Sequence, residues 1–185
     1  MTYEHADGYK IRNQEATHFL TFSVVGWIDI FSRKLYRDCI LSSLDFCRRE
    51  KGLLLGSYVI MSNHIHTIWT AKKANISSLI RDFKTFTSKE ITKLIKSENE
   101  SRREWLLHMF EFHARRTNRN EVYKMWTSQN HPEEIVTSEF MNTKVNYIHQ
   151  NPVRAGLVRE PEHYLYSSAS NYEKGRGLID IDYLY

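Results

Sequence analysis

The chain has 185 residues, 41% of them hydrophobic, which suffices for one buried core. No linker-like stretch divides it, so we expect a single domain spanning 1–185. No segment reaches the roughly 18 apolar residues that a membrane span needs, and residues 1–14 lack the apolar stretch of a signal peptide. These features exclude a membrane protein and predict a cytoplasmic one.

Cysteine content excludes two kinds of structure, and charge suggests a binding partner. The two cysteines, Cys39 and Cys47, fall in one helical pattern, which excludes both a disulfide framework and a zinc finger. The net charge is +4, and the basic residues cluster at 48–51, 102–103 and 115–119. Nucleic acid is the natural anionic partner, which would associate the protein with the nucleoid. The alternative is that each cluster is a solvated helix end.

The first half of the chain alternates between strand-like and helix-like patterns of apolar residues. Residues 18–25 are aromatic and β-branched and predict a strand. A helix follows, with Ser32 as its cap, apolar positions from Leu35 to Cys47, and a stop at Gly52. Residues 53–61 and 64–70 then predict a hairpin whose turn contains Ser62 and Asn63.

The second half adds two helices and a strand. Residues 76–95 predict an amphipathic helix with a basic outer face, and 98–120 a charged helical insertion that could bind DNA, form a dimer contact or simply pack. We then expect a strand at 121–127, a helix at 138–151 that ends before Pro152, and a tail at 173–185 with a mobile loop and a short extended piece.

The order of these elements predicts the architecture. Strand, helix, strand, strand, helix, strand is the order of a ferredoxin-like α+β domain, an antiparallel sheet with helices packed on one face. The other face of the sheet would then be free for a ligand.

Two histidines near the hairpin turn are candidate metal ligands. His64 and His66 alternate with Ile65, so in a strand both imidazoles lie on the same sheet face, together with Ile68, while Ile65 and Trp69 face the opposite side. With nine histidines in the chain, about 0.4 such matches are expected by chance, so the tripeptide alone is weak. A strand histidine is also often a structural residue.

The helix at 138–151 carries a candidate nucleophile, Tyr147. Lys144 and Asn151 share its helix face, whereas His149 points elsewhere. Asn151, with Gln150 as second choice, could complete a site of two imidazoles and one oxygen, which suits Mg²⁺ or Mn²⁺, although the ligand types would also accept zinc. A phenol is mostly protonated at neutral pH, so Lys144 or a metal-bound phosphate would have to assist its ionisation. Tyr147 could instead be a packing residue.

Two blocks of sequence resemble a known family. Ser57-Tyr-Val-Ile-Met-Ser-Asn-His-Ile-His66 and Tyr147-Ile-His-Gln-Asn-Pro-Val-Arg-Ala-Gly-Leu-Val158 are similar to signature blocks of the single-tyrosine HUH transposases, and most similar to those of the REP-associated tyrosine transposases. Softer similarity covers most of the chain. The resemblance implies the HUH nuclease fold, a divalent metal on His64 and His66 with Asn151 at the family's polar position, and attack by Tyr147 on single-stranded DNA.

The resemblance also implies how DNA would be handled. Attack would leave a 5′-phosphotyrosine and a free 3′-hydroxyl on a strand next to a hairpin, as in transposition by DNA strand transfer. Dimers and monomers both occur in the family, so a homodimer is left open. The basic residues that we expect to contact DNA are Arg81, Lys84, Lys89, Arg115, Arg116, Arg119 and Arg154.

Two other functions fit the same residues. A four-stranded sheet with a free aromatic and basic face could bind single strands without catalysis, as RNA-recognition domains do, although their signature aromatics are not evident. A metal-dependent phosphodiesterase using water would leave Tyr147 a structural role.

Overall fold

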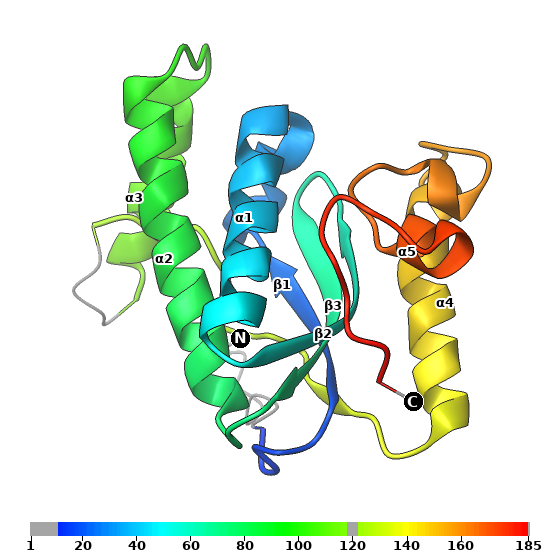
Figure 1. Cartoon of the computed structure of the whole chain (residues 1–185). Coiled ribbons are helices and arrows are strands. Elements are labelled where there is room, and N and C mark those ends of the chain that lie inside the picture. Colours follow the sequence, from blue (N-terminus) through cyan, green and yellow to red (C-terminus); the bar gives the residue numbers. More distant parts are fainter. Residues whose placement is uncertain (1–10, 118–121, 185) are drawn as a thin grey trace, which may run out of the picture.

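The computed structural model describes residues 11–117 and 122–184, and its centre is a four-stranded antiparallel sheet (Figure 1). The strand order is β2-β3-β1-β4, with β2 at one edge and β4 at the other. The strands are β1 His18–Ser23, β2 Leu53–Ile60, β3 His64–Ala71 and the very short β4 Glu133–Glu134. The predicted hairpin, β2 followed by β3, is confirmed, and β1 lies beside β3.

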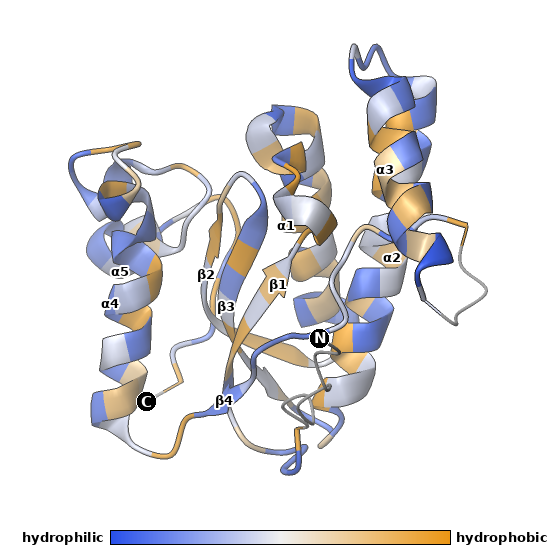
Figure 2. Ribbon diagram, turned by 180° about the vertical axis from the view of Figure 1, so that it is seen from behind, coloured by the Kyte–Doolittle hydropathy of each residue, from blue (hydrophilic) through white to orange (hydrophobic). Residues whose placement is uncertain are grey.

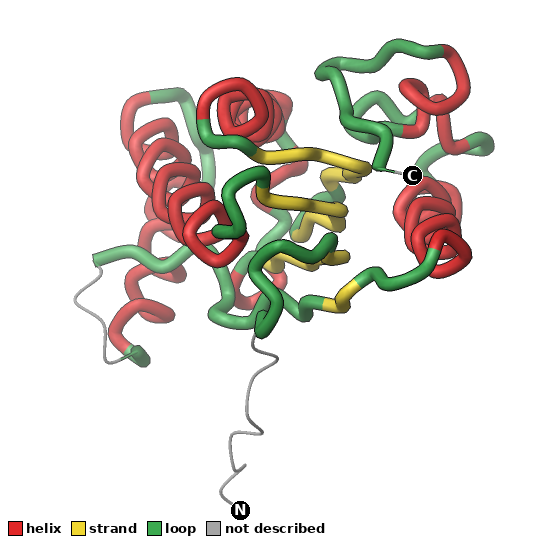
Figure 3. Tube along the Cα trace, turned by 60° about the horizontal axis from the view of Figure 1, so that its bottom comes forward, coloured by secondary structure: helices red, strands yellow, loops and turns green. Residues whose placement is uncertain are grey.

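Helices lie on both sides of this sheet (Figures 1 and 3). On one side are α1 Lys34–Glu50, α2 Ile76–Ser97 and α3 Arg103–Arg115; on the other are α4 Ser138–Arg154 and the short α5 Ala169–Lys174. Short 3-10 turns span Val25–Trp27, Ile30–Ser32 and Pro161–His163. The predicted α+β class is confirmed. No helix of the described ranges is long and apolar enough to cross a membrane.

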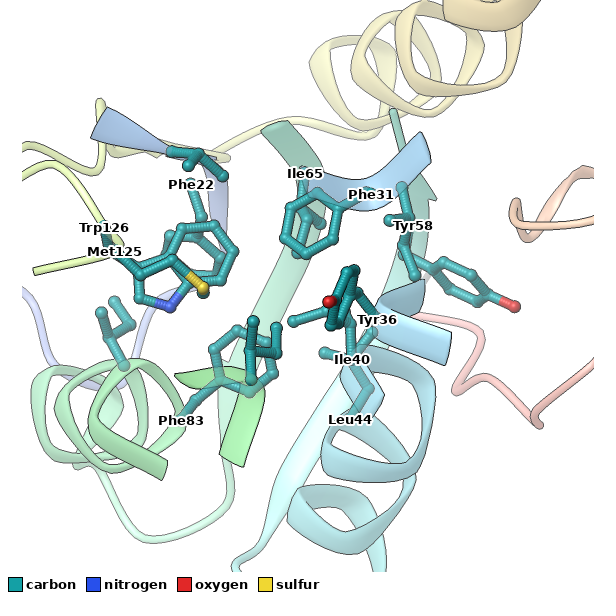
Figure 4. Close-up of a cluster of buried hydrophobic side chains, with 14 of the residues drawn as sticks. Phe22, Phe31, Tyr36, Ile40, Leu44, Tyr58, Ile65, Phe83, Met125 and Trp126 are labelled. Carbon is teal, nitrogen blue, oxygen red and sulfur yellow. The ribbon is translucent and has the colours of Figure 1, made fainter. Parts of the chain in front are cut away.

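Two apolar clusters, one on each face, hold the layers together. The larger lies between the sheet and α1, α2 and α3. It includes Trp69 and, labelled in Figure 4, Phe22, Ile65 and Phe83. The smaller joins the opposite face to α4 through Phe19, Val59, Met61, Ile68, Met141, Val145 and Ile148. The predicted orientation of the β3 side chains is therefore confirmed. The expectation of a free second face was wrong, because the apolar side of α4 covers it.

The strand predicted at 121–127 was wrong over its described part. Residues 122–127 contain only one isolated bridge, between Trp126 and Val24, although Thr127 N–H also bonds to Ser23 O. Met125 and Trp126 are buried in the larger core, so this segment follows the core and not a regular ladder. The fourth strand is instead β4, which is hydrophilic and lies at the sheet edge (Figure 2).

Two predicted helix ends also shifted. The cap of α4 is Thr137, whose hydroxyl accepts from Phe140 N–H, and α4 continues through Pro152 to Arg154. Pro152 is buried in the last turn, two residues before the helix ends at Arg154, and its missing N–H removes one helical bond there. At the start of α1 the cap position is Arg33, and Ser32 belongs to the preceding 3-10 turn.

The C-terminal tail lies along the edge of β2. Asp182 N–H donates to Leu55 O, and the Asp182 carboxylate accepts from Leu55 N–H and forms an ion pair with Arg48. One backbone bond and one side-chain bond thus hold the tail beside Leu55, without a regular strand pairing.

Candidate active site

The two histidines lie side by side on β3, on the sheet face that α4 covers. Their ring centroids are 4.7 Å apart; His66 is buried and His64 is half-buried. Each Nδ1 has a hydrogen-bond partner: Thr21 Oγ1 lies 2.9 Å from that of His66, and Asn63 Oδ1 lies 2.7 Å from that of His64. Because the amide oxygen only accepts, His64 carries its proton on Nδ1 and leaves the Nε2 lone pair available.

Both imidazoles are held in the neutral form. Burial lowers the pKa of His64. Burial, the charge that His64 would carry if protonated, and the Arg154 and Lys144 charges lower the pKa of His66 to about 3. Neutral imidazoles with their Nδ1 atoms fixed by neighbours are the usual arrangement of histidine metal ligands. These residues therefore fit a divalent cation.

Tyr147 lies directly beside this pair. Its ring centroid is 5.2 Å from that of His66, and the ring of Phe19 contacts both residues, at 5.5 Å from His66 and 5.8 Å from Tyr147. Tyr147 is 38% exposed, so its hydroxyl-bearing ring remains open to a ligand from outside. The predicted meeting of strand and helix residues is thus present in the geometry, within one chain.

Two cations flank the tyrosine. The Arg154 guanidinium lies 4.4 Å from the centre of the Tyr147 ring and donates to Tyr147 O. Lys144 Nζ is 5.9 Å from the same ring and 4.4 Å from that of Phe19, and it forms a 2.7 Å ion pair with Glu133 of β4. Lys144 is thus near the candidate nucleophile, but Glu133 already engages its ammonium group.

The other candidate ligands come from the last turns of α4. Asn151 lies one turn beyond Tyr147 on the same helix face and is half-buried, as is Gln150. Among residues 11–117 and 122–184, no cluster of three or more His, Cys, Asp and Glu residues could hold a metal. An amide oxygen such as that of Asn151 therefore stays the candidate for a third protein ligand.

His149 faces away from the site, as its helical position predicted. It is buried between α4 and β2, where its Nε2 lies 3.1 Å from Ser57 Oγ and 2.9 Å from Ser168 Oγ. The ring also contacts Tyr172 edge-on at 4.9 Å. These contacts lock the rotation of α4, and so help to direct Tyr147 toward His66.

Three of the predicted DNA-binding residues line one hollow of about 480 Å³ between α2 and the segment 123–130: Arg81, Lys84 and Lys89. A neighbouring hollow of about 620 Å³ shares Lys89 and adds Lys93 and Lys96. No described residue lining either hollow is acidic. We call the two together the α2 groove.

The α2 groove adjoins β1 at Asn130. Lys84 crosses it, donating to Thr127 O and Asn130 Oδ1, and Asn130 O accepts from Thr21 N–H on β1. Arg115 and Arg116 lie apart from the groove, at the end of α3, where Arg115 pairs with Glu111 and Arg116 lies over Phe112. Arg119 is outside the described residues.

Sequence patterns missed several neighbours of the site. Phe19 and Thr21 come from β1, and only the pairing of Thr21 with His66 and of Phe19 with Ile68 reveals them. Asn63 was assigned to a turn without a role. Period-two alternation in residues 18–23 would have placed Phe19 and Thr21 on one face, but not next to the histidines.

Comparison with known proteins shows the fold. No family model matches the chain, and no curated protein matches it. Among solved structures, a REP-associated tyrosine transposase bound to a REP hairpin is similar, with a TM-score of 0.59 and 20% identity over 97% of this chain and 92% of the other. The similarity extends over both layers of helices and the sheet, and it agrees with the family suggested by the sequence blocks.

Proposed function

We propose that this chain, which has the fold of a REP-associated tyrosine transposase, is a metal-dependent endonuclease and strand transferase acting on single-stranded DNA next to a hairpin. The observation that carries the proposal is the contact between Tyr147 and His66, whose ring centroids are 5.2 Å apart although they lie 81 positions apart in the sequence. A nucleophile and a pair of neutral imidazoles thus share one open site.

Tyr147 would act on the phosphodiester directly. Its hydroxyl oxygen attacks phosphorus, the bond from phosphorus to the 3′ oxygen breaks, and the phenol proton is released while the leaving oxygen takes up a proton as a 3′-hydroxyl. The product is a 5′-phosphotyrosine. Because the phosphodiester bond energy is kept in this linkage, a second 3′-hydroxyl can reverse the step and join another strand.

The residues around Tyr147 have separate roles in this proposal. A divalent cation, Mg²⁺ or Mn²⁺, supplies polarisation of the scissile phosphate when bound. His64 and His66 would hold it, with Asn151 as the oxygen ligand and Gln150 as the alternative. Lys144 and Arg154 raise the local positive potential, which favours binding of the scissile phosphate.

The α2 groove would hold the rest of the DNA. It offers a row of cations from Arg81 to Lys96 without acidic residues in its described lining, together with Tyr123 and Trp126. Such a surface suits a phosphate backbone. Arg115 and Arg116 would contribute at the end of α3, and Arg119, outside the described residues, stays a proposed DNA contact. Binding to DNA would place the protein on the nucleoid.

The structure bears on the competing functions. A non-catalytic module of the RNA-recognition type needs an uncovered sheet face, and α4 and α2 cover both faces here. A water-using phosphodiesterase would not need a tyrosine against the histidines. Because Tyr147 and His66 of one chain are in contact, the proposed site does not require a homodimer.

The test is formation of a covalent adduct. The protein is incubated with a DNA hairpin carrying single-stranded flanks and Mn²⁺, then run on a denaturing gel. We expect an adduct with the parent protein and with Tyr183→Phe, an exposed tyrosine on the tail, and none with Tyr147→Phe or with EDTA. An adduct that persists in Tyr147→Phe, or free cleavage product without any adduct, would overturn the proposal.

A further inference from the structure

Trp27 is an exposed aromatic residue beside the candidate active site. Its side chain is 68% exposed, and its ring centroid lies 6.2 Å from that of His64 in an edge-on arrangement. The backbone at Trp27 has φ 56°, in the left-handed region, directly after Gly26 with φ 61°. A bulky residue rarely adopts this conformation, and the surrounding structure must impose it.

One side chain connects Trp27 to the histidine pair. Asn63 donates from Nδ2 to Trp27 O and accepts at Oδ1 from His64 Nδ1, at 3.3 Å and 2.7 Å. The same amide therefore holds both the strained loop and the imidazole. A shift of one would disturb the other, so the position of the indole is coupled to that of the candidate metal ligand.

The loop that carries Trp27 is also fixed from behind. Val24 N–H donates to Asn63 O, Val25 N–H to Met125 O, and Ile28 N–H to Val25 O. On α3, His113 Nε2 lies 3.1 Å from where a Cβ would stand on Gly26, so the loop and helix are in close contact. The predicted insertion thus has a definite role, because α3 supports this loop.

We propose that Trp27 is a stacking platform for the nucleobase adjoining the scissile phosphate at the site of His64 and His66. The inference rests on the proposed function for the identity of that phosphate. A rigid, exposed indole offers a flat surface at little entropic cost, and nucleobases stack on such surfaces without requiring a particular sequence. Trp27 contributes little to the hydrophobic core, because most of its side chain is exposed to solvent.

The first experiment measures binding without cleavage. Tyr147→Phe protein and the double variant that also carries Trp27→Ala are each titrated with a DNA hairpin carrying single-stranded thymidine flanks. We expect the affinity to fall about 5- to 150-fold, the range of one base stacked on an aromatic residue. Trp27→Tyr should keep most of the affinity, and Trp105→Ala, an exposed tryptophan on α3, should keep all of it. Equal DNA affinity of Tyr147→Phe protein with and without Trp27→Ala would overturn the inference.

The second experiment identifies the base. The binding measurements are repeated with DNAs that each carry a single abasic position in one flank. At one position near the cleavage site the abasic DNA should bind parent and Trp27→Ala equally, because the stacking partner is already missing. A penalty from Trp27→Ala that is the same for every abasic DNA would contradict stacking and would point to a contact with the backbone or with another protein surface.

A third experiment uses the strained backbone. Trp27→Gly relieves the left-handed conformation, so we expect it to raise the melting temperature while it weakens DNA binding as much as Trp27→Ala does. A lower melting temperature would show that the indole supports the fold instead. Because none of these readouts needs cleavage, an absent adduct with intact stacking would refute only the proposed function, and an adduct with no effect of Trp27→Ala only this inference.

Discussion

Thr21→Val should weaken metal binding without disturbing the fold. Thr21 Oγ1 lies 2.9 Å from His66 Nδ1, and valine has nearly the same shape and suits a strand. The substitution leaves the buried imidazole nitrogen without this partner, which costs about 1–3 kcal/mol. Loss of such an orienting contact typically lowers metal affinity about 10- to 100-fold, or about 1.4–2.7 kcal/mol.

The measurement is Mn²⁺ titration by calorimetry at neutral pH, with circular dichroism to verify folding. Thr70→Val is the matched control, because it removes a 2.6 Å hydroxyl bond to Thr17 at the other end of β3. We expect Thr70→Val to bind Mn²⁺ as the parent does and His66→Ala to bind none. If Thr21→Val binds Mn²⁺ with unchanged affinity, Thr21 does not orient the ligand and the proposed support of His66 is wrong.

Three further predictions concern the fold, the helix of Tyr147 and the groove. Burial alone would raise the pKa of Glu100, but hydrogen bonds from Arg102 N–H, the Arg33 guanidinium and the Tyr36 hydroxyl lower this pKa to about 2. The ionised carboxylate therefore stabilises the fold above about pH 4.5, and this stabilisation is lost as the pH falls toward 2. Glu100→Gln should therefore lower the free energy of unfolding in urea by about 3 kcal/mol at pH 7 and by less below pH 4, whereas a difference independent of pH would contradict this. His149→Leu removes the bonds to two buried serines and should slow adduct formation while DNA affinity stays unchanged; an unaltered adduct rate would mean that other contacts set the rotation of α4. Lys89→Gln should weaken DNA binding and reduce the slope of log affinity against log salt by about one, and an unchanged slope would remove Lys89 from the interface.

The sequence was informative where local pattern and burial agree. The alternation of His64, Ile65 and His66 matched their true faces, because β3 is covered on both sides and a slip by one residue would bury the imidazoles in the larger core. Helical spacing correctly separated Tyr147 from His149. These are properties of a single element, and periodicity alone determines them.

The relations between elements were beyond sequence periodicity. The strand prediction was wrong over residues 122–127 because Met125 and Trp126 are apolar for a reason unrelated to strand pairing. Both side chains are buried in the core between the sheet and α2. The cover of the second face by α4 depends on a short apolar side of the helix, including Met141 and Ile148, and helical periodicity does not show which sheet face such a side packs on. Thr21 and Trp27 acquire their neighbours only through tertiary contacts.

The proposed mechanism is tested most directly by finding which tyrosine becomes attached to DNA. After incubation with hairpin DNA and Mn²⁺, nuclease digestion and proteolysis, mass spectrometry of the peptides locates the residual nucleotide. We expect one modified peptide, with the nucleotide on Tyr147, in a chain that has 11 tyrosines. A nucleotide on another tyrosine, or none at all when the DNA has been cut, would contradict it.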